Sequence, residues 1–172
     1  MKIHKSLLAL AVFIPLLLFG CSNEPTTESK PNDKDVVASE KTLPENFHEI
    51  AFVRETGPMF EYMVKKSVNS SEFEQTWELY GFEKKLPSIN FKEKDVFFIG
   101  VHESGSCPHK IENIEVSSDN KTMTLPLSEP EGNCTSDATP RTFVIQVDKE
   151  TSEKIENVVI AESGYETKVP FE

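Results

Sequence analysis

Two cysteines and two histidines in the second half of the chain are the residues best suited to chemistry. Cys107 and Cys134 each lie in a loop segment that contains Gly and Pro, and His102 and His109 flank Cys107. A cysteine pair in an oxidising compartment forms a disulfide, whereas two cysteines with two histidines can hold a zinc ion. The choice between these interpretations depends on where the protein is located, and the third cysteine, Cys21, bears on that question.

Cys21 directly follows an apolar N-terminal segment. Lys2 and Lys5 precede a run of about 14 mostly apolar residues, which is shorter than the roughly 20 that a membrane-spanning helix needs and is typical of an export signal. Leu18-Phe19-Gly20-Cys21 resembles the lipobox of bacterial lipoproteins. The resemblance implies cleavage after Gly20, a diacylglyceryl group on Cys21, and a lipid-anchored protein of the cell envelope that faces outside the cytoplasm. The alternatives are a soluble secreted protein and an uncleaved anchor helix.

If Cys21 carries the lipid, an even pair of cysteines remains in an exported domain. We therefore predict a disulfide between Cys107 and Cys134. The alternative is a metal site of His102, Cys107, His109 and Cys134, although their spacing matches no known zinc module and thiolates oxidise readily outside the cell. We expect no resident metal or cofactor.

The chain is strongly acidic, with 18 basic and 29 acidic residues and a formal charge of −11. Removal of residues 1–20 takes away Lys2 and Lys5 and no acidic residue, so the formal charge becomes −13. This balance argues against binding to nucleic acid and against electrostatic adhesion to anionic lipid. The expected partners are the membrane, through the lipid on Cys21, and an unknown envelope protein.

Composition divides the chain into three parts. We expect a lipoprotein signal peptide at 1–20, a disordered tether at 21–44 that is polar and lacks aromatic residues, and one domain at 45–172. In the domain, Ser71 and Glu74 have the spacing of a capping box, and Phe73, Trp77 and Tyr80 follow at helical spacing before Gly81. We therefore predict a helix near 72–80 that packs an aromatic face on the core.

Most other apolar segments have the pattern of strands. Residues 95–103 contain the continuous apolar run Val96-Phe97-Phe98-Ile99, which is typical of a central strand buried on both faces, and residues 121–127 alternate strictly. Ser118-Asp119-Asn120 has turn composition and predicts a hairpin. The further expected strands are 47–55, 59–66, 111–117, 142–147 and 157–161. The predicted fold class is α+β, a mainly antiparallel sheet of about six or seven strands with one packed helix.

We find no pattern of catalytic residues in the sequence. Ser104-Gly105-Ser106 lacks the Gly-x-Ser-x-Gly pattern of a nucleophile elbow, and the adjacent residues His102 and Glu103 must point to opposite faces of a strand. A metal-dependent hydrolase that uses His102 and His109 is the enzymatic alternative. The preferred interpretation is a non-enzymatic domain whose binding surface lies at the disulfide-tied end of the sheet, around His102, Glu103, His109 and Arg141, because long polar loops on a rigid scaffold often carry function.

The order of features between Val64 and Val147 is similar to the C-terminal domain of the protease-complex subunit PrcB and its secreted relatives. The segments that carry this resemblance are the helix of Ser71, Phe73 and Trp77, the segment 86–91, the apolar strand 96–101, the loop 104–108 and Pro140-Arg141-Thr142. The resemblance covers about half of the chain. It implies a small α+β domain that binds or steadies another protein, and it adds the regulation of an envelope protease as an alternative function.

Overall fold

The computed structural model describes residues 35–171, which form two β-sheets and three helices. The elements are β1 (Val36–Glu40), α1 (Phe47–Ile50), β2 (Phe52–Val53), β3 (Glu61–Ser67), α2 (Ser70–Leu79), β4 (Lys94–Glu103), β5 (Lys110–Ile111), β6 (Glu115–Val116), β7 (Thr122–Ser128), β8 (Thr139–Asp148), α3 (Lys149–Ser152), β9 (Asn157–Glu162) and β10 (Tyr165–Val169). The fold is α+β with mostly antiparallel sheets, as predicted, and it has more strands than expected. The signal peptide, Cys21 and the tether as far as residue 34 lie outside the described residues.

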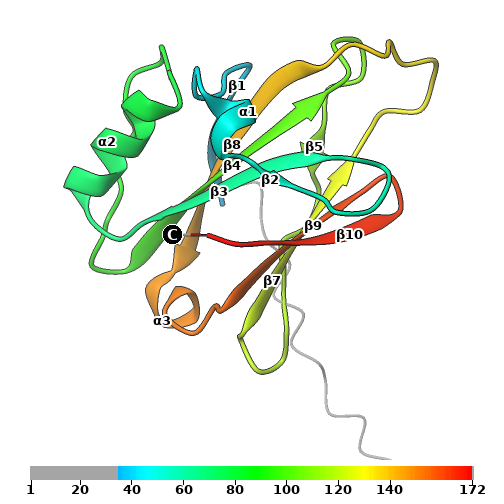
Figure 1. The fold of residues 1–172 in the computed structure, drawn as a ribbon. Coiled ribbons are helices and arrows are strands. Elements are labelled where there is room, and N and C mark those ends of the chain that lie inside the picture. Colours follow the sequence, from blue (N-terminus) through cyan, green and yellow to red (C-terminus); the bar gives the residue numbers. More distant parts are fainter. Residues whose placement is uncertain (1–34, 172) are drawn as a thin grey trace, which may run out of the picture.

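The strands form two sheets of five that pack face to face (Figure 1). The first has the order β1-β8-β4-β3-β2, and all its neighbours are antiparallel. The second has the order β10-β9-β7-β5, and β6 also pairs with β7. Within it, β7 and β9 are parallel, because the chain leaves for β8 in the first sheet between them. The single long helix, α2, covers the outer face of the first sheet.

Strand β4 is the centre of the first sheet and contributes to two cores. Its residues Asp95–Val101 are all buried, which confirms the prediction of a central strand covered on both faces. One face, with Phe97, Ile99 and Val101, packs between the two sheets against Met123, Leu125, Val158 and Ile160. The other face, with Val96 and Phe98, packs under α2 against Phe73, Trp77 and Tyr80. The aromatic face predicted for the helix is therefore confirmed.

The N-cap of helix α2 lies two residues before the predicted N-cap, Ser71. Asn69 is the N-cap, and its Oδ1 accepts a hydrogen bond from the Glu72 backbone N–H at 3.0 Å. Glu72 Oε2 in turn accepts from the Val68 N–H at 2.9 Å. The capping box is therefore formed by Asn69 and Glu72, and the prediction that Ser71 and Glu74 form it is wrong, since Asn is at least as good a cap as Ser. The expected stop is present, because Gly81 has a φ of +69° just past the end of the helix.

The domain begins before residue 45, so the predicted boundary of the tether is wrong. Val36–Glu40 forms β1, which pairs with β8 at the edge of the first sheet. The short apolar run Val36-Val37-Ala38 is enough to cover this edge, because Val36 packs on the inter-sheet core and Val37 and Ala38 pack on the core under α2. The Thr42 hydroxyl then donates to the Tyr80 carbonyl oxygen at 2.6 Å, which ties the next residues to the end of α2.

Three other element predictions need correction. Residues 111–117, predicted as one strand, form the separate two-residue strands β5 and β6. Residues 47–55, predicted as one strand, form the single-turn helix α1 and the two-residue strand β2, because only Phe47 of 47–50 is buried and no alternating face exists. The last strand, β10, was not predicted. By contrast, the hairpin at 118–120 is confirmed: β6 and β7 pair antiparallel, and the Asn120 N–H donates to the Ser117 carbonyl oxygen at 2.8 Å. No helix among residues 35–171 is long and apolar enough to cross a membrane.

Gly100 in β4 lets three segments meet over the first sheet. A Cβ at this position would lie 2.7 Å from Leu43 Cδ2, 3.2 Å from Tyr80 Cε1 and 3.4 Å from Phe47 Cε2. The absence of a side chain therefore allows α1, the segment after β1 and the end of α2 to pack on the same point of β4. A methyl group there would force at least one of these side chains away.

We predict that Gly100→Ala lowers the free energy of unfolding by about 1–3 kcal/mol, the usual cost of overpacking. Urea denaturation monitored by Trp77 fluorescence measures the change. Gly57→Ala is the control, because a Cβ at Gly57 meets nothing within 4 Å and its effect should stay within about 0.5 kcal/mol. Equal destabilisation by the two variants would contradict this account of Gly100.

Candidate functional site

On three strands, a row of alternate side chains faces the space between the sheets and ends in a glutamate. The three glutamates lie at the same end of the molecule. The row Phe97-Ile99-Val101 of β4 ends in Glu103, and the row Val158-Ile160 of β9 ends in Glu162. The row Met123-Leu125-Leu127 of β7 continues to Glu129, one residue past the strand. With Tyr62, His109 and Arg141 these glutamates form what we call the inter-sheet polar cluster.

Glu103 is buried and fully paired. Its Oε1 accepts hydrogen bonds from Arg141 Nε at 2.9 Å and Nη2 at 2.7 Å, and its Oε2 accepts from the His109 backbone N–H at 2.8 Å. The antiparallel register of β4 and β8 pairs Val101 with Arg141, which brings the guanidinium within reach of Glu103. Two charge-assisted hydrogen bonds to one oxygen and a backbone N–H to the other satisfy both oxygens of this buried carboxylate.

Opposing effects act on the pKa of Glu162. Its Oε2 accepts a hydrogen bond from the Tyr62 hydroxyl at 2.8 Å, and its Oε1 lies 3.8 Å from His109 Nε2. Burial raises the pKa of Glu162, and the negative charge of Glu129 adds to this effect, while the hydrogen bond from Tyr62 and the proximity of His109 oppose it. Burial and the neighbouring Glu162 also raise the pKa of Tyr62, so its hydroxyl stays protonated as the donor.

His109 joins Glu162 to Glu129. Its side chain is only 1 % exposed, and its Nε2 lies 2.9 Å from Glu129 Oε1. Its Nδ1 is buried and has no hydrogen-bond partner within the described part of the chain.

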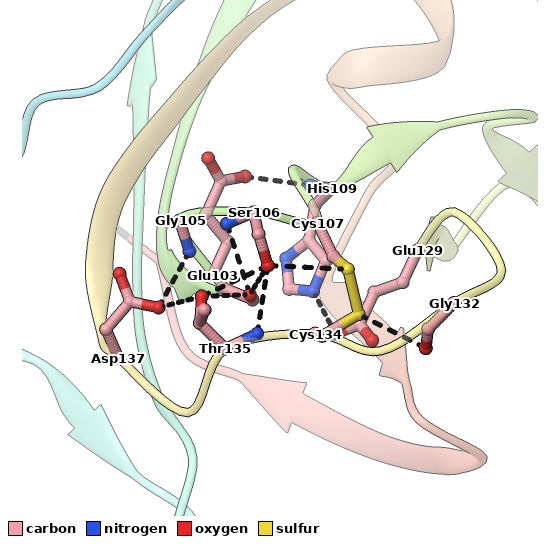
Figure 2. Close-up of a disulfide and its surroundings, with 11 residues drawn as sticks. Glu103, Gly105, Ser106, Cys107, His109, Glu129, Gly132, Cys134, Thr135 and Asp137 are labelled. Atoms are coloured by element: carbon pink, nitrogen blue, oxygen red, sulfur yellow. Dashed lines mark hydrogen bonds and ion pairs between the residues drawn. A yellow bond between two sulfur atoms is a disulfide. The ribbon is translucent and has the colours of Figure 1, made fainter.

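A disulfide closes this end of the sandwich (Figure 2). Cys107 and Cys134 are bonded, with a Cα–Cα distance of 5.5 Å, as the sequence predicts. The bond joins the loop that leads to His109 to the loop that follows Glu129. It therefore connects two of the segments that carry the inter-sheet polar cluster.

Hydroxyl groups and one carboxylate connect the same two loops at the surface. Ser106 Oγ accepts from the Thr135 N–H at 2.9 Å, and Asp137 Oδ1 accepts from the Gly105 N–H at 3.1 Å (Figure 2). Hydrogen bonds from the Thr135 hydroxyl, the Gly105 N–H and the Thr139 hydroxyl lower the pKa of Asp137 to about 2. A Cβ on Gly105 would meet the Asp137 carboxylate and the Thr139 hydroxyl, so a side chain there would displace Asp137 from its hydrogen bonds.

The structure does not form the metal site considered from the sequence. Both cysteines are in the disulfide, so neither thiolate is available to His102 and His109. His102 also lies on the opposite face of β4 from Glu103, as the alternation predicts. There its ring stacks on His48 at a centroid distance of 5.2 Å, and its Nδ1 lies 3.8 Å from Glu61 Oε2. Burial and the nearby His48 lower the pKa of His102, while Glu61 opposes this effect.

The binding surface predicted from the sequence needs a similar correction. Glu103 and His109 are buried between the sheets, Arg141 points inward to Glu103, and His102 lies on the other face. These four residues therefore do not form one accessible surface. The sequence analysis also missed Tyr62, Glu129 and Glu162, although the alternation of β7 and β9 places both glutamates in line with buried apolar residues.

Comparisons with protein-family models, with curated proteins and with solved structures found no match. The resemblances described from the sequence therefore remain predictions.

We predict that Glu162→Gln becomes more stabilising relative to the wild type as the pH rises. Burial raises the pKa of Glu162 in the folded state, so its contribution to stability is present below the unfolded pKa and is lost as the pH rises through the folded value. Each unit of difference is worth about 1.4 kcal/mol. The glutamine keeps an oxygen that accepts from Tyr62 and carries no charge to bury. Urea denaturation between pH 4 and pH 8 in the presence of a chelator measures the difference, and a difference independent of pH would contradict the prediction.

Proposed function

We propose that this protein is a lipid-anchored domain of the cell envelope that binds another protein outside the cytoplasm. Two features support the location. The lipobox-like sequence ends in Cys21, and the Cys107–Cys134 disulfide is of the kind that persists in oxidising compartments. In this arrangement the lipid holds the domain at the membrane, and the domain presents its surface to a partner.

The observation that carries the binding proposal is an exposed tip of apolar and aromatic side chains. The loop between β2 and β3 lies beside the turn between β9 and β10, at the right of Figure 1. Met59 at this tip is 62 % exposed and Tyr165 is 43 % exposed. We call Arg54, Met59, Phe60 and Tyr165 the hairpin tip. Met, Tyr, Phe and Arg are the residue types enriched in protein interfaces, and Tyr and Arg are common at their energetic centres.

Contacts within the hairpin tip hold it in one conformation. Arg54 lies over the Tyr165 ring, with Cζ 5.0 Å from the ring centroid, and the Phe60 and Tyr165 rings are 6.4 Å apart. The Arg54 guanidinium also donates to the carbonyl oxygens of Thr56 and Pro58. A surface that is ordered before binding loses little conformational entropy on association, which favours its use as a docking element.

We predict that Cys21→Ser releases the protein from the membrane. Two acyl chains anchor a protein stably because each buried methylene contributes about 0.8 kcal/mol, and the variant has no thiol to carry them. Metabolic labelling with an alkyne fatty acid, followed by membrane fractionation, measures both attachment and location. Ser22→Ala should stay labelled and membrane-bound, and equal labelling of the Cys21 variant would refute the anchor.

We predict that a photoreactive amino acid at Met59 crosslinks one defined envelope protein in intact cells. Lys92 is the control position, because it is exposed and lies just before the start of β4, at the other end of the first sheet from the hairpin tip. In the double variant Met59→Ser, Tyr165→Ser, the photoreactive amino acid is placed at a second surface position near the tip. This variant should crosslink the same protein at least about tenfold less, which is the effect of losing interface hot spots.

Mass spectrometry of the crosslinked product identifies the partner. The same band from Met59 and Lys92, or no crosslink from Met59, would count against the hairpin tip as the docking element. Capture that is unchanged by the double variant would do so as well.

A further inference from the structure

The side chains of His109, Glu129 and Glu162 come from three different segments and meet at one point. One ligand atom from each, His109 Nε2 and a carboxylate oxygen of each glutamate, can be chosen so that all lie within 4.8 Å of one another. His109 Nε2 is 2.9 Å from Glu129 Oε1 and 3.8 Å from Glu162 Oε1. We infer that these three residues form a binding site for a divalent transition-metal ion of the Zn²⁺ type. This inference does not depend on the proposed docking function.

The separations suit a single ion. Two nitrogen or oxygen ligands at about 2.1 Å from a Zn²⁺ ion lie about 3.0 Å apart at a right angle and about 3.4 Å apart at the tetrahedral angle. The distances from His109 Nε2 to the two glutamates bracket these values. The carboxylate oxygens of Glu129 and Glu162 lie within 4.8 Å of each other, so a movement of the half-exposed Glu129 side chain would close the site on an ion.

The charge balance of the cluster favours a cation. Glu162 is buried, and among residues 35–171 the ion pairs of Glu129 and Glu162 go to His109 alone. Arg141, the arginine of the cluster, donates from Nε and Nη2 to Glu103 and from Nη1 to Ser39 Oγ. Two carboxylates therefore share one histidine as their ion-pair partner within this part of the chain. A divalent cation provides positive charge in the space where Nε2 and the carboxylates converge.

The surroundings of the two glutamates match those of metal ligands, whereas His109 Nδ1, which carries the proton when Nε2 binds an ion, has no acceptor among residues 35–171. The Tyr62 hydroxyl donates to the outer oxygen of Glu162, as a group that orients a metal ligand does. Glu129 is half-exposed, so one side of the site is open to a water or other exogenous ligand. One imidazole and two carboxylates suit Zn²⁺ or Mn²⁺ better than soft ions, which prefer thiolates, and both cysteines nearby are unavailable because they form the disulfide.

The test is Zn²⁺ binding to the purified, disulfide-bonded full-length protein after removal of metals with a chelator. Calorimetry should give one ion per chain, and thermal unfolding should shift upward by at least about 5 °C at a hundredfold excess over the dissociation constant. Mg²⁺ should give no comparable shift at the same concentration, because it prefers oxygen ligands in an octahedral shell.

Matched variants place the ion. Glu129→Gln removes a carboxylate from a half-exposed residue, so the fold should persist, and it should weaken Zn²⁺ binding at least tenfold. Glu131→Gln is the control, because it removes the same charge two residues further along an exposed loop and should bind as the wild type does. A circular dichroism spectrum checks the fold of each variant.

Three results would overturn the inference. The first is no binding by the wild type at about 1 mM Zn²⁺, and the second is equal affinity of the Glu129 and Glu131 variants. The third is loss of binding on His102→Gln with binding retained on Glu129→Gln, which would place the ion at the His48–His102 pair on the opposite face of β4.

Discussion

The inward face of β4 sets the constraint on which the rest of the structure depends. Its row Asp95-Phe97-Ile99-Val101-Glu103 is apolar in the middle and has a buried carboxylate at each end. Asp95 accepts a hydrogen bond from Ser152 at 2.8 Å and lies 3.5 Å from Lys66 Nζ, and Glu103 is held by Arg141. Lys149 Nζ also lies 3.7 Å from Asp95, so removal of Arg141 is the change that would leave a buried carboxylate without a cationic partner, which is strongly destabilising. Since a shift of one residue would turn the whole row to the other face, the two paired carboxylates fix the register of β4 against β3 and β8.

The same arrangement concentrates negative charge at one end of the sandwich. Three inward rows end there in Glu103, Glu129 and Glu162, and Arg141 is used by the first of them. The other two glutamates share one histidine, whose ring can donate from Nε2 but has no partner at Nδ1. Burial raises the pKa of Glu162, and the negative charge of Glu129 adds to this effect.

Sequence patterns predicted the elements whose determinants are local. The continuous apolar run of β4, the strict alternation of β7, the turn at 118–120 and the aromatic face of α2 each depend on residues that are close in sequence. β1 was missed because its strand character comes from pairing with β8, about a hundred residues away, rather than from its own short apolar run. The polar cluster was missed for a related reason. Alternation could place Glu129 and Glu162 on inward faces, but only the parallel pairing of β7 with β9 brings them together, and nothing local indicates that pairing.

The hydrogen bond between Tyr62 and Glu162 connects the inter-sheet polar cluster to the hairpin tip. Tyr62 lies in β3, two residues after Phe60. Glu162 pairs with Tyr165 across the β9–β10 turn. This buried bond therefore joins the two hairpins whose loops form the tip, although its residues are 100 positions apart. Glu162 therefore belongs both to the inter-sheet polar cluster and to the hairpin whose turn contributes Tyr165 to the hairpin tip.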